Sequence, residues 1–356
     1  MPIQIDDIYY SYMKKTPLVH EALRGVSLEI NDGEFIGLIG RTGSGKSTLI
    51  QHFNGLLKPD SGRIVVDGIN TASGSLRELR RKVGLIFQFP EYQLFEETVF
   101  KDIAYGISKR GYGEAETRER VYRAAEAVGI SGALMQRSPF ELSGGQRRRV
   151  AIAGVLVMEP KYLVMDEPGS GLDPEGREEI FSYVSKLHED AGVCVILVSH
   201  NMEDVARLAR RVIVIEEGRI IMDGPPETVF TRIEDLEQSG LRAPETQYLM
   251  KRLKTVVPEI NEGAITVRQA ADEIEKWLLA AGCNPAGGAD IPATVGADIP
   301  VPAGADIPAA ADAEIPVPAD ADIPATVGAE MPVPACAEIP VPTVTSVDTT
   351  GGGICT

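Results

Sequence analysis

A glycine-rich loop that ends in a lysine and two hydroxyl residues is the first group in this sequence that can do chemistry. It lies between an apolar run, Phe35–Ile39, that predicts a buried strand and a stretch, Ser47–Leu56, that predicts a helix. Backbone N–H groups of such a loop turn inward around phosphates, and the helix directs its positive end toward them. The sequence therefore predicts a nucleotide-binding loop formed by Gly40, Arg41, Thr42, Gly43, Ser44, Gly45, Lys46, Ser47 and Thr48.

Three side chains of this loop have separate expected roles. Lys46 supplies a positive charge to the β- and γ-phosphates, Ser47 offers a hydroxyl to Mg²⁺, and Thr48 can bind the α-phosphate. The alternative is a glycine-rich turn that binds no ligand, but such a turn would not require the lysine and the hydroxyl that follow it. ATP with Mg²⁺ is the expected ligand.

An acidic pair, Asp166 and Glu167, follows the apolar strand Tyr162–Met165. Asp166, at the end of the strand, is expected to hold the metal through water. Glu167 is placed to polarise the attacking water as a general base. Two acids after a strand can also serve solubility alone, but a phosphate-binding loop upstream at this distance makes that alternative weak.

A third motif, Ser143-Gly144-Gly145-Gln146, precedes the helical stretch Gly145–Val157. Ser143 is a natural N-cap for this helix. Its hydroxyl and the amides of Gly144 and Gly145 can also face a γ-phosphate held by another subunit. The alternative is an ordinary capped helix, which the full motif followed by three arginines disfavours.

Single residues at strand ends complete the expected site. Gln88 follows the strand Val83–Phe87 and can coordinate Mg²⁺ or the attacking water. His200 follows the strand Val193–Val198 and fits a γ-phosphate contact, although a lone histidine there is more often structural. Tyr12 is expected to stack on adenine, with Tyr10 as the competing candidate.

Short apolar runs that alternate with helical stretches predict an α/β domain with a mainly parallel sheet. The N-terminal runs Ile3–Tyr12 and Ala22–Ile30 alternate instead like an antiparallel strand pair. The remaining expected elements are a strand at Val212–Ile215 and helices at Glu114–Val128 and Glu175–Asp190.

Charge and hydropathy exclude several classes of protein. The net charge of −17 is concentrated at the C-terminus, where ten acidic residues and no Lys or Arg follow Lys276. The preceding residues form no basic stripe, so we expect no nucleic-acid partner. The sequence has no signal-peptide pattern and no apolar run of membrane-spanning length, which predicts a cytosolic chain.

Residues 3 to about 233 resemble an ATP-binding cassette (ABC) transporter ATPase, in which Leu142–Gln146 is the signature motif. The segments Phe87–Phe95 and Arg149–Gly154 are similar to those of energy-coupling factor (ECF) transporter ATPases, closest to the second, A-prime type. The implied fold is a P-loop NTPase ABC cassette with a mainly parallel sheet core, an antiparallel N-terminal β subdomain and a helical signature subdomain. Gly169 departs from the usual threonine, with little expected effect.

The resemblance implies partners and a location as well as an activity. ABC ATPases build each site from the phosphate loop of one cassette and the signature of another, so this chain is expected to work with a second ABC ATPase, identical or not. Ser143–Gln146 and Ser170–Asp173 would then act on the partner's ATP. In ECF importers two ATPases dock on a transmembrane T component that drives a vitamin- or metal-binding S component. The chain would lie peripherally on the cytoplasmic face of the cell membrane.

Two other classes of function remain as alternatives. Soluble ABC ATPases of translation or DNA repair fuse two cassettes or insert long coiled coils, and this sequence has neither feature. A non-catalytic scaffold would not retain Lys46, Gln88, Glu167 and His200 together. We therefore predict the ATP-hydrolysing subunit of an ECF-type importer.

Two further segments follow the predicted cassette, which covers residues 1–233. Residues 234–282 are expected to form a helical dimerisation extension, with amphipathic helices at Glu245–Leu253 and Thr266–Leu279. Residues 283–356 contain an acidic Pro/Ala-rich octapeptide repeat, whose proline content predicts disorder with polyproline II character. A solubilising role for this tail is favoured over partner docking.

Overall fold

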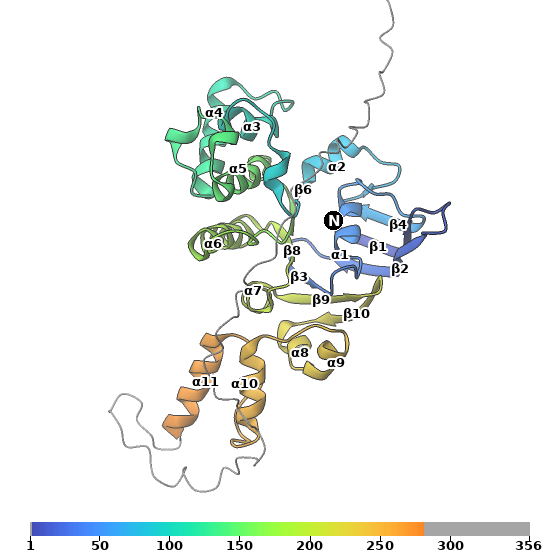
Figure 1. Ribbon diagram of the computed structural model, residues 1–356, viewed down its shortest axis with the longest axis vertical. Helices are drawn as coiled ribbons and strands as arrows, with labels where there is room; N and C mark the ends of the chain where they lie inside the picture. Colours follow the sequence, from blue (N-terminus) through green and yellow to red (C-terminus); the bar gives the residue numbers. More distant parts are fainter. Residues whose placement is uncertain (1, 281–356) are drawn as a thin grey trace, which may run out of the picture. The chain divides into compact units, whose positions relative to one another are not determined.

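The computed structural model of this protein describes residues 2–280 (Figure 1). These residues form two β-sheets with helices around them, in agreement with the predicted α/β cassette. The tail predicted at 283–356, with its octapeptide repeat, lies outside the described residues, as do residues 281 and 282.

The larger sheet has six strands and is mainly parallel. Its strands are β3 (Phe35–Ile39), β6 (Val83–Ile86), β7 (Tyr162–Asp166), β8 (Cys194–Val198), β9 (Arg211–Glu216) and β10 (Arg219–Gly224). Their order is β10-β9-β3-β8-β7-β6, and only β10 pairs antiparallel to its neighbour. The inner strands are continuous apolar runs because both faces of this sheet are covered.

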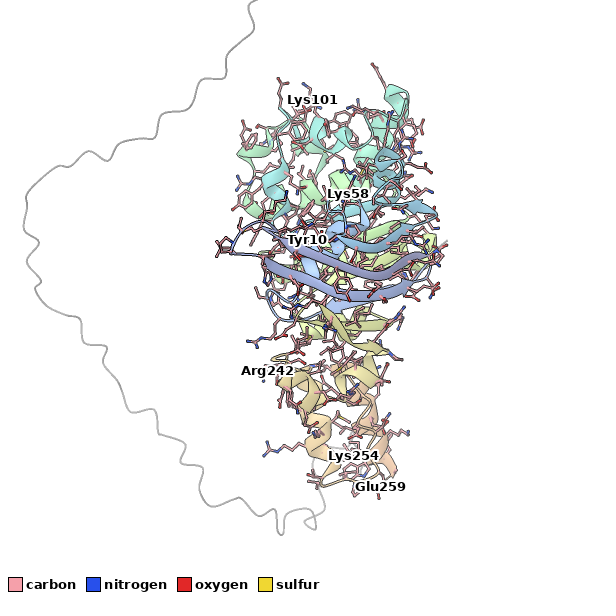
Figure 2. All side chains as sticks on the ribbon, turned by 90° about the vertical axis from the view of Figure 1, so that its right-hand side faces the viewer. Tyr10, Lys58, Lys101, Arg242, Lys254 and Glu259 are labelled. Atoms are coloured by element: carbon pink, nitrogen blue, oxygen red, sulfur yellow. The ribbon has the colours of Figure 1, made fainter. Side chains whose placement is uncertain are left out.

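The smaller sheet has four antiparallel strands, of which the alternating N-terminal sequence predicts two, Ile3–Tyr12 and Ala22–Ile30; the other two were not predicted. Its strands are β1 (Ile3–Tyr12), β2 (His20–Ile30), β4 (Ser61–Val66) and β5 (Ile69–Asn70). Their order is β2-β1-β4-β5. This sheet faces the viewer in Figure 2, where Tyr10 marks strand β1.

Eleven α-helices and three 3₁₀ turns occur in the described part of the chain. The helices are α1 (Lys46–Phe53), α2 (Leu76–Lys82), α3 (Val99–Tyr105), α4 (Glu114–Ala127), α5 (Gly144–Leu156), α6 (Pro174–Ala191), α7 (Met202–Leu208), α8 (Pro226–Phe230), α9 (Ile233–Gln238), α10 (Glu245–Lys254) and α11 (Val267–Ala280). The 3₁₀ turns are η1 (Pro90–Gln93), η2 (Gly132–Leu134) and η3 (Pro139–Glu141). Helices α3, α4 and α5 pack against one another as the predicted helical subdomain (Figure 1).

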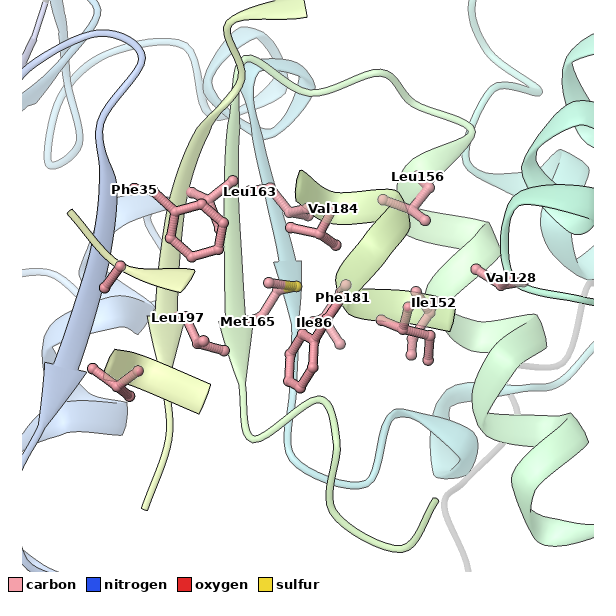
Figure 3. Close-up of a cluster of buried hydrophobic side chains, with 14 of the residues drawn as sticks. Phe35, Ile86, Val128, Ile152, Leu156, Leu163, Met165, Phe181, Val184 and Leu197 are labelled. Carbon is pink, nitrogen blue, oxygen red and sulfur yellow. The ribbon is translucent and has the colours of Figure 1, made fainter. Parts of the chain in front are cut away.

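Side chains of the larger sheet alternate between two hydrophobic cores. On β3, Phe35 belongs to the first core and Ile36 to the second. The first core also contains Ile152 of α5 and Phe181 of α6 (Figure 3). The second core contains Leu49 of α1 and the inner face of the smaller sheet. Packing on both faces holds the strand ends, and the loops that follow them, in fixed positions.

The C-terminal helices α10 and α11 share a third, small core. Its buried members are Met250, Val257, Ile260, Ala264 and Ala270. Trp277 packs on this core from α11. The two amphipathic helices expected here are present, and their role in dimerisation stays a prediction. Among residues 2–280, no helix is both long enough and apolar enough to cross a membrane.

Candidate functional site

The predicted catalytic residues lie at one edge of the larger sheet. The strands β3, β6, β7 and β8 run in the same direction, so their carboxyl ends meet at this edge. The phosphate loop follows β3, Gln88 follows β6, Asp166 and Glu167 stand at the end of β7, and His200 follows β8. Sheet topology thus gathers residues that are far apart in the sequence.

A cavity of about 270 Å³ lies at this edge. Ten of the predicted site residues line it: Tyr12, Thr42, Gly43, Gly45, Lys46, Ser47, Thr48, Gln88, Asp166 and Glu167. Its other lining residues are His20 and Ala22 of β2. The sequence offered no signal for these two, because neither residue carries a recognisable motif.

The phosphate loop needs glycine at Gly45 for a steric reason. This residue has φ +108°, and a Cβ atom there would lie 2.5 Å from the carbonyl oxygen of Ala22. Lys46, the first residue of α1, donates hydrogen bonds from Nζ to the carbonyl oxygens of Gly40 at 2.6 Å and Arg41 at 2.9 Å. The Lys46 ammonium group therefore lies against its own loop, where it can contact an anion that the loop binds.

Burial and neighbouring acids act in opposite directions on Lys46. Desolvation lowers the pKa of its ammonium group, while the carboxylates of Asp166 and Glu167 oppose that change. Burial likewise raises the pKa of Asp166, and a hydrogen bond of 2.9 Å from the Ser47 hydroxyl opposes the rise. The cavity thus holds one cation and two acids in a desolvated cluster.

Glu167 has a constrained backbone and a histidine partner. Its φ is +52°, in the left-handed region that non-glycine residues rarely adopt. Its N–H donates to the carbonyl oxygen of Val198 at 2.9 Å. Its Oε2 lies 2.8 Å from Nδ1 of His200, whose side chain is 73% exposed. The imidazole of His200 is therefore in direct polar contact with the Glu167 carboxylate in this structure.

The N-terminal tyrosines divide between the cavity and the core. The Tyr12 hydroxyl lies 3.2 Å from Oγ1 of Thr48, and 38% of the residue is exposed. Tyr10 packs edge-on against both Tyr12 and His52 and joins the second core. This arrangement leaves Tyr12 at the cavity, and its stacking on adenine stays a prediction.

The signature motif does not line the cavity. Ser143 caps α5 by accepting from the N–H of Gln146, and the Gln146 side chain accepts from the N–H of Ser143 in return. An added Cβ on Gly144 would meet no atom within 4 Å, so the space beside its backbone is open. Asp173 caps α6 by accepting from the N–H of Gly176 at 3.2 Å. Within one chain these residues serve as helix caps, and the structure does not bring them to the phosphate loop.

Comparison with proteins of known family shows to which class of nucleotide-binding proteins this chain belongs. The family model for ABC transporters matches residues 23–170. A protein of Acetivibrio thermocellus named energy-coupling factor transporter ATP-binding protein EcfA2 is 52% identical over 278 residues, covering 78% of this chain and 99% of the relative. An EcfA2 protein of Clostridium tetani is also 52% identical, over 279 residues, 78% of this chain and 97% of the relative. The chain belongs to the ECF transporter ATP-binding proteins. It is an ATP-hydrolysing subunit of an ABC importer, and the predicted resemblance to the second ATPase of that family is confirmed.

Solved structures of related cassettes agree with this membership. The cbiO1 structure from Clostridium perfringens, part of the ABC transporter complex cbiONQ, is 39% identical with a TM-score of 0.58, covering 70% of this chain and 98% of that one. The dimeric structure of an ATP-binding cassette, MJ0796, bound to ADP and Pi is 31% identical with a TM-score of 0.58. The match covers 63% of this chain and 98% of that one. The predicted fold of a P-loop NTPase ABC cassette is thereby confirmed.

Proposed function

We propose that this chain hydrolyses ATP at composite sites shared with a second cassette, and thereby drives uptake of a vitamin or metal ion through membrane partners. The observation that supports the proposal most directly is that one chain holds the two halves of a site in separate places. Lys46, Ser47, Asp166 and Glu167 line one cavity, whereas Ser143 and its glycines lie outside it. Reconstitution of the chain with a second ABC ATPase and with T and S components in vesicles tests the proposal, because ATP-dependent solute uptake must then appear.

The residues that line the cavity offer a partner for each part of a nucleotide. Tyr12 offers an aromatic face to adenine, and the loop amides with Thr48 meet the inner phosphates. Lys46, which feels the charges of Asp166 and Glu167, would reach the β- and γ-phosphates. His200 contacts Glu167 and would hold its carboxylate toward the water that attacks the γ-phosphate, besides its predicted contact with that phosphate.

The oxygen ligands of the cavity suit Mg²⁺. The described residues contain no cluster of three or more histidine, cysteine or acidic side chains able to hold a metal. Ser47, Asp166 and Gln88 instead offer a hydroxyl, a carboxylate and an amide oxygen, and Mg²⁺ is commonly held by one or two carboxylates together with substrate phosphates. Bound there with ATP, the ion would neutralise charge on the phosphates.

The open backbone of the signature motif supports the composite site. Gly144 and the Ser143 hydroxyl stand at the exposed N-terminus of α5, which favours an anion. Asp173 stands at the start of α6, after the turn that carries Glu167. Each would therefore meet the ATP bound by the opposite cassette.

We expect Ser143→Ala to impair the site whose phosphate loop belongs to the partner. In a dimer of two differently tagged copies, Lys46→Ala and Ser143→Ala are placed either on one copy or on separate copies. If the sites are composite, placing the two changes on separate copies (the split dimer) puts both defects in one site. The other site then remains intact. Both defects on one copy damage both sites. ATPase activity must therefore be clearly higher in the split dimer, and equal activity in the two arrangements or the opposite order contradicts the composite site.

A second, larger cavity of about 910 Å³ supports the docking of a T component. Basic and apolar residues line it, among them Arg80, Arg81, Phe95, Tyr105 and Met158. Aromatic side chains near Gln88 are exposed rather than packed into a core, with Tyr92 at 84% and Phe95 at 57% exposure. Exposed apolar side chains of this density mark an interaction surface.

Tyr92→Ala is expected to uncouple transport from hydrolysis. ATPase activity of the purified cassette dimer should change less than about twofold, because Tyr92 is exposed and outside the catalytic cavity. ATP-driven uptake in vesicles should fall by about tenfold, since a buried aromatic anchor is typically worth over 1 kcal/mol. Tyr9→Ala on β1 is the control and should leave uptake unchanged. A fall in melting temperature with uptake preserved contradicts the docking role.

A further inference from the structure

Arg148 is a buried arginine beside the catalytic turn. It lies in the second turn of α5 and is 2% exposed, whereas its neighbours Arg147 and Arg149 are partly exposed. Burying a guanidinium is unfavourable unless it finds hydrogen-bond acceptors or an opposite charge. The partners of this side chain therefore indicate why the position carries an arginine.

Two of these partners are consecutive backbone carbonyls at the catalytic glutamate. Nη2 of Arg148 donates to the carbonyl oxygen of Glu167 at 2.6 Å, and Nε donates to that of Pro168 at 3.1 Å. The planar fork of a guanidinium can hold both carbonyls in one orientation. Because Glu167 has φ +52°, its backbone needs such outside support to keep this conformation.

The third partner belongs to the segment after Gln88. Oε2 of Glu91, in η1, lies 3.8 Å from Nη1 of Arg148. This oxygen is buried and accepts no hydrogen bond from any described residue, so the guanidinium is the charge that compensates it. One side chain thus connects the helix that Ser143 caps, the turn that holds Glu167 and the segment that follows Gln88.

We propose that Arg148 is a positioning residue for ATP hydrolysis, which holds the Glu167 turn in its active conformation and ties it to the signature helix and to η1. The inference rests on the proposed role of Glu167 as general base. Arg148 does not touch the ATP; it acts through the two carbonyls and through Glu91. Movement of α5 or η1 is thereby passed to the catalytic carboxylate.

The test compares Arg148→Lys, Arg148→Met and Glu91→Gln in the full-length chain within its ATPase dimer. Lysine keeps the charge but cannot donate to two carbonyls in a fixed plane. A misplacement of about 1 Å can lower a rate about 10²-fold, so we expect both Arg148 variants to lose about 10- to 100-fold in kcat. The KM for ATP and calorimetric ATP affinity should change less than about threefold. Arg120→Met, which removes an arginine paired with Glu116 and Glu159 elsewhere, is the control.

Glu91→Gln and a double variant measure the coupling. Glu91→Gln should lower kcat less than Arg148→Met does, because it leaves both carbonyl contacts in place. The fold-loss in kcat of the double variant should be smaller than the product of the two single fold-losses, as expected for groups in contact.

Each outcome bears on the proposal. If kcat, ATP affinity and melting temperature fall together, or if the Arg148 variants retain kcat, the positioning role is wrong. Should Arg148→Met fail to fold, Arg148→Lys decides by the same criteria. Glu167→Gln is measured in parallel: if that variant keeps its turnover, the role of Glu167 is what fails. Inactive Glu167→Gln with fully active Arg148 variants overturns only the present inference.

Discussion

Replacing Glu167 with glutamine is expected to lower ATP turnover by about 10²- to 10⁴-fold, the usual contribution of a general base. Glutamine has nearly the same shape as glutamate but cannot accept a proton from the attacking water. The residues proposed to hold the phosphates and the metal, including Lys46, Ser47 and Asp166, are unchanged, and all three line the cavity. ATP binding should therefore persist, and the cassettes should accumulate as an ATP-bound dimer.

Phosphate release and gel filtration with ATP give the two measurements for this variant. Glu227→Gln, on α8 and away from the cavity, is the matched control and should behave like the unmodified chain. A Glu167→Gln protein that remains monomeric with ATP and still hydrolyses it shows that another group activates the water. His200→Ala should then be measured next, because His200 lies against the Glu167 carboxylate.

The parallel core of the fold was predictable because its strands are covered on both faces. The five predicted strands Phe35–Ile39, Val83–Phe87, Tyr162–Met165, Val193–Val198 and Val212–Ile215 match observed strands within one residue at each end. The edge strand β10 was not predicted. Its exposed residues alternate with buried or partly buried ones, so it lacks a continuous apolar run, and its pairing with β9 is interrupted by a register shift.

The motifs of the site were predictable because each is contiguous in the sequence. The contacts between motifs were not, because they depend on which side chain turns inward. Arg147, Arg148 and Arg149 are chemically identical in the sequence, yet Arg148 alone of the three is buried, against the carbonyls of Glu167 and Pro168. Only the packing of α5 on the turn after β7 distinguishes it.

The choice between Tyr10 and Tyr12 illustrates the same limit at one strand. In a regular strand, residues two apart face the same side, so both tyrosines would be equivalent. The pairing of β1 with β2 shifts register between Tyr10 and Ser11, which breaks this equivalence. Tyr10 then packs in the core beside His52, while Tyr12 reaches the cavity. A register shift of this kind leaves no signal in the residue pattern.

Lys46→Ala is expected to weaken ATP binding itself, in contrast to the change at Glu167. A hydrogen bond to a charged group contributes about 1.5–3 kcal/mol, so the Kd for ATP should rise by about 10- to 100-fold. The loss is large at this position because the ammonium group is partly desolvated, and water cannot fully replace it. Hydrolysis at saturating ATP should fall as well, since charge develops on the γ-phosphate.

Calorimetry with ATP distinguishes this effect from a general loss of structure. Lys46 also donates to the carbonyls of Gly40 and Arg41, so alanine removes two hydrogen bonds that shape the loop. Lys46→Arg keeps the charge and separates the two contributions: weak binding in both variants indicates that the shape of the loop matters most. Lys58→Ala, at an exposed site outside the cavity, is the control. Unchanged ATP affinity in Lys46→Ala contradicts the assignment, because a cation that contacts the phosphates cannot be removed without cost to binding.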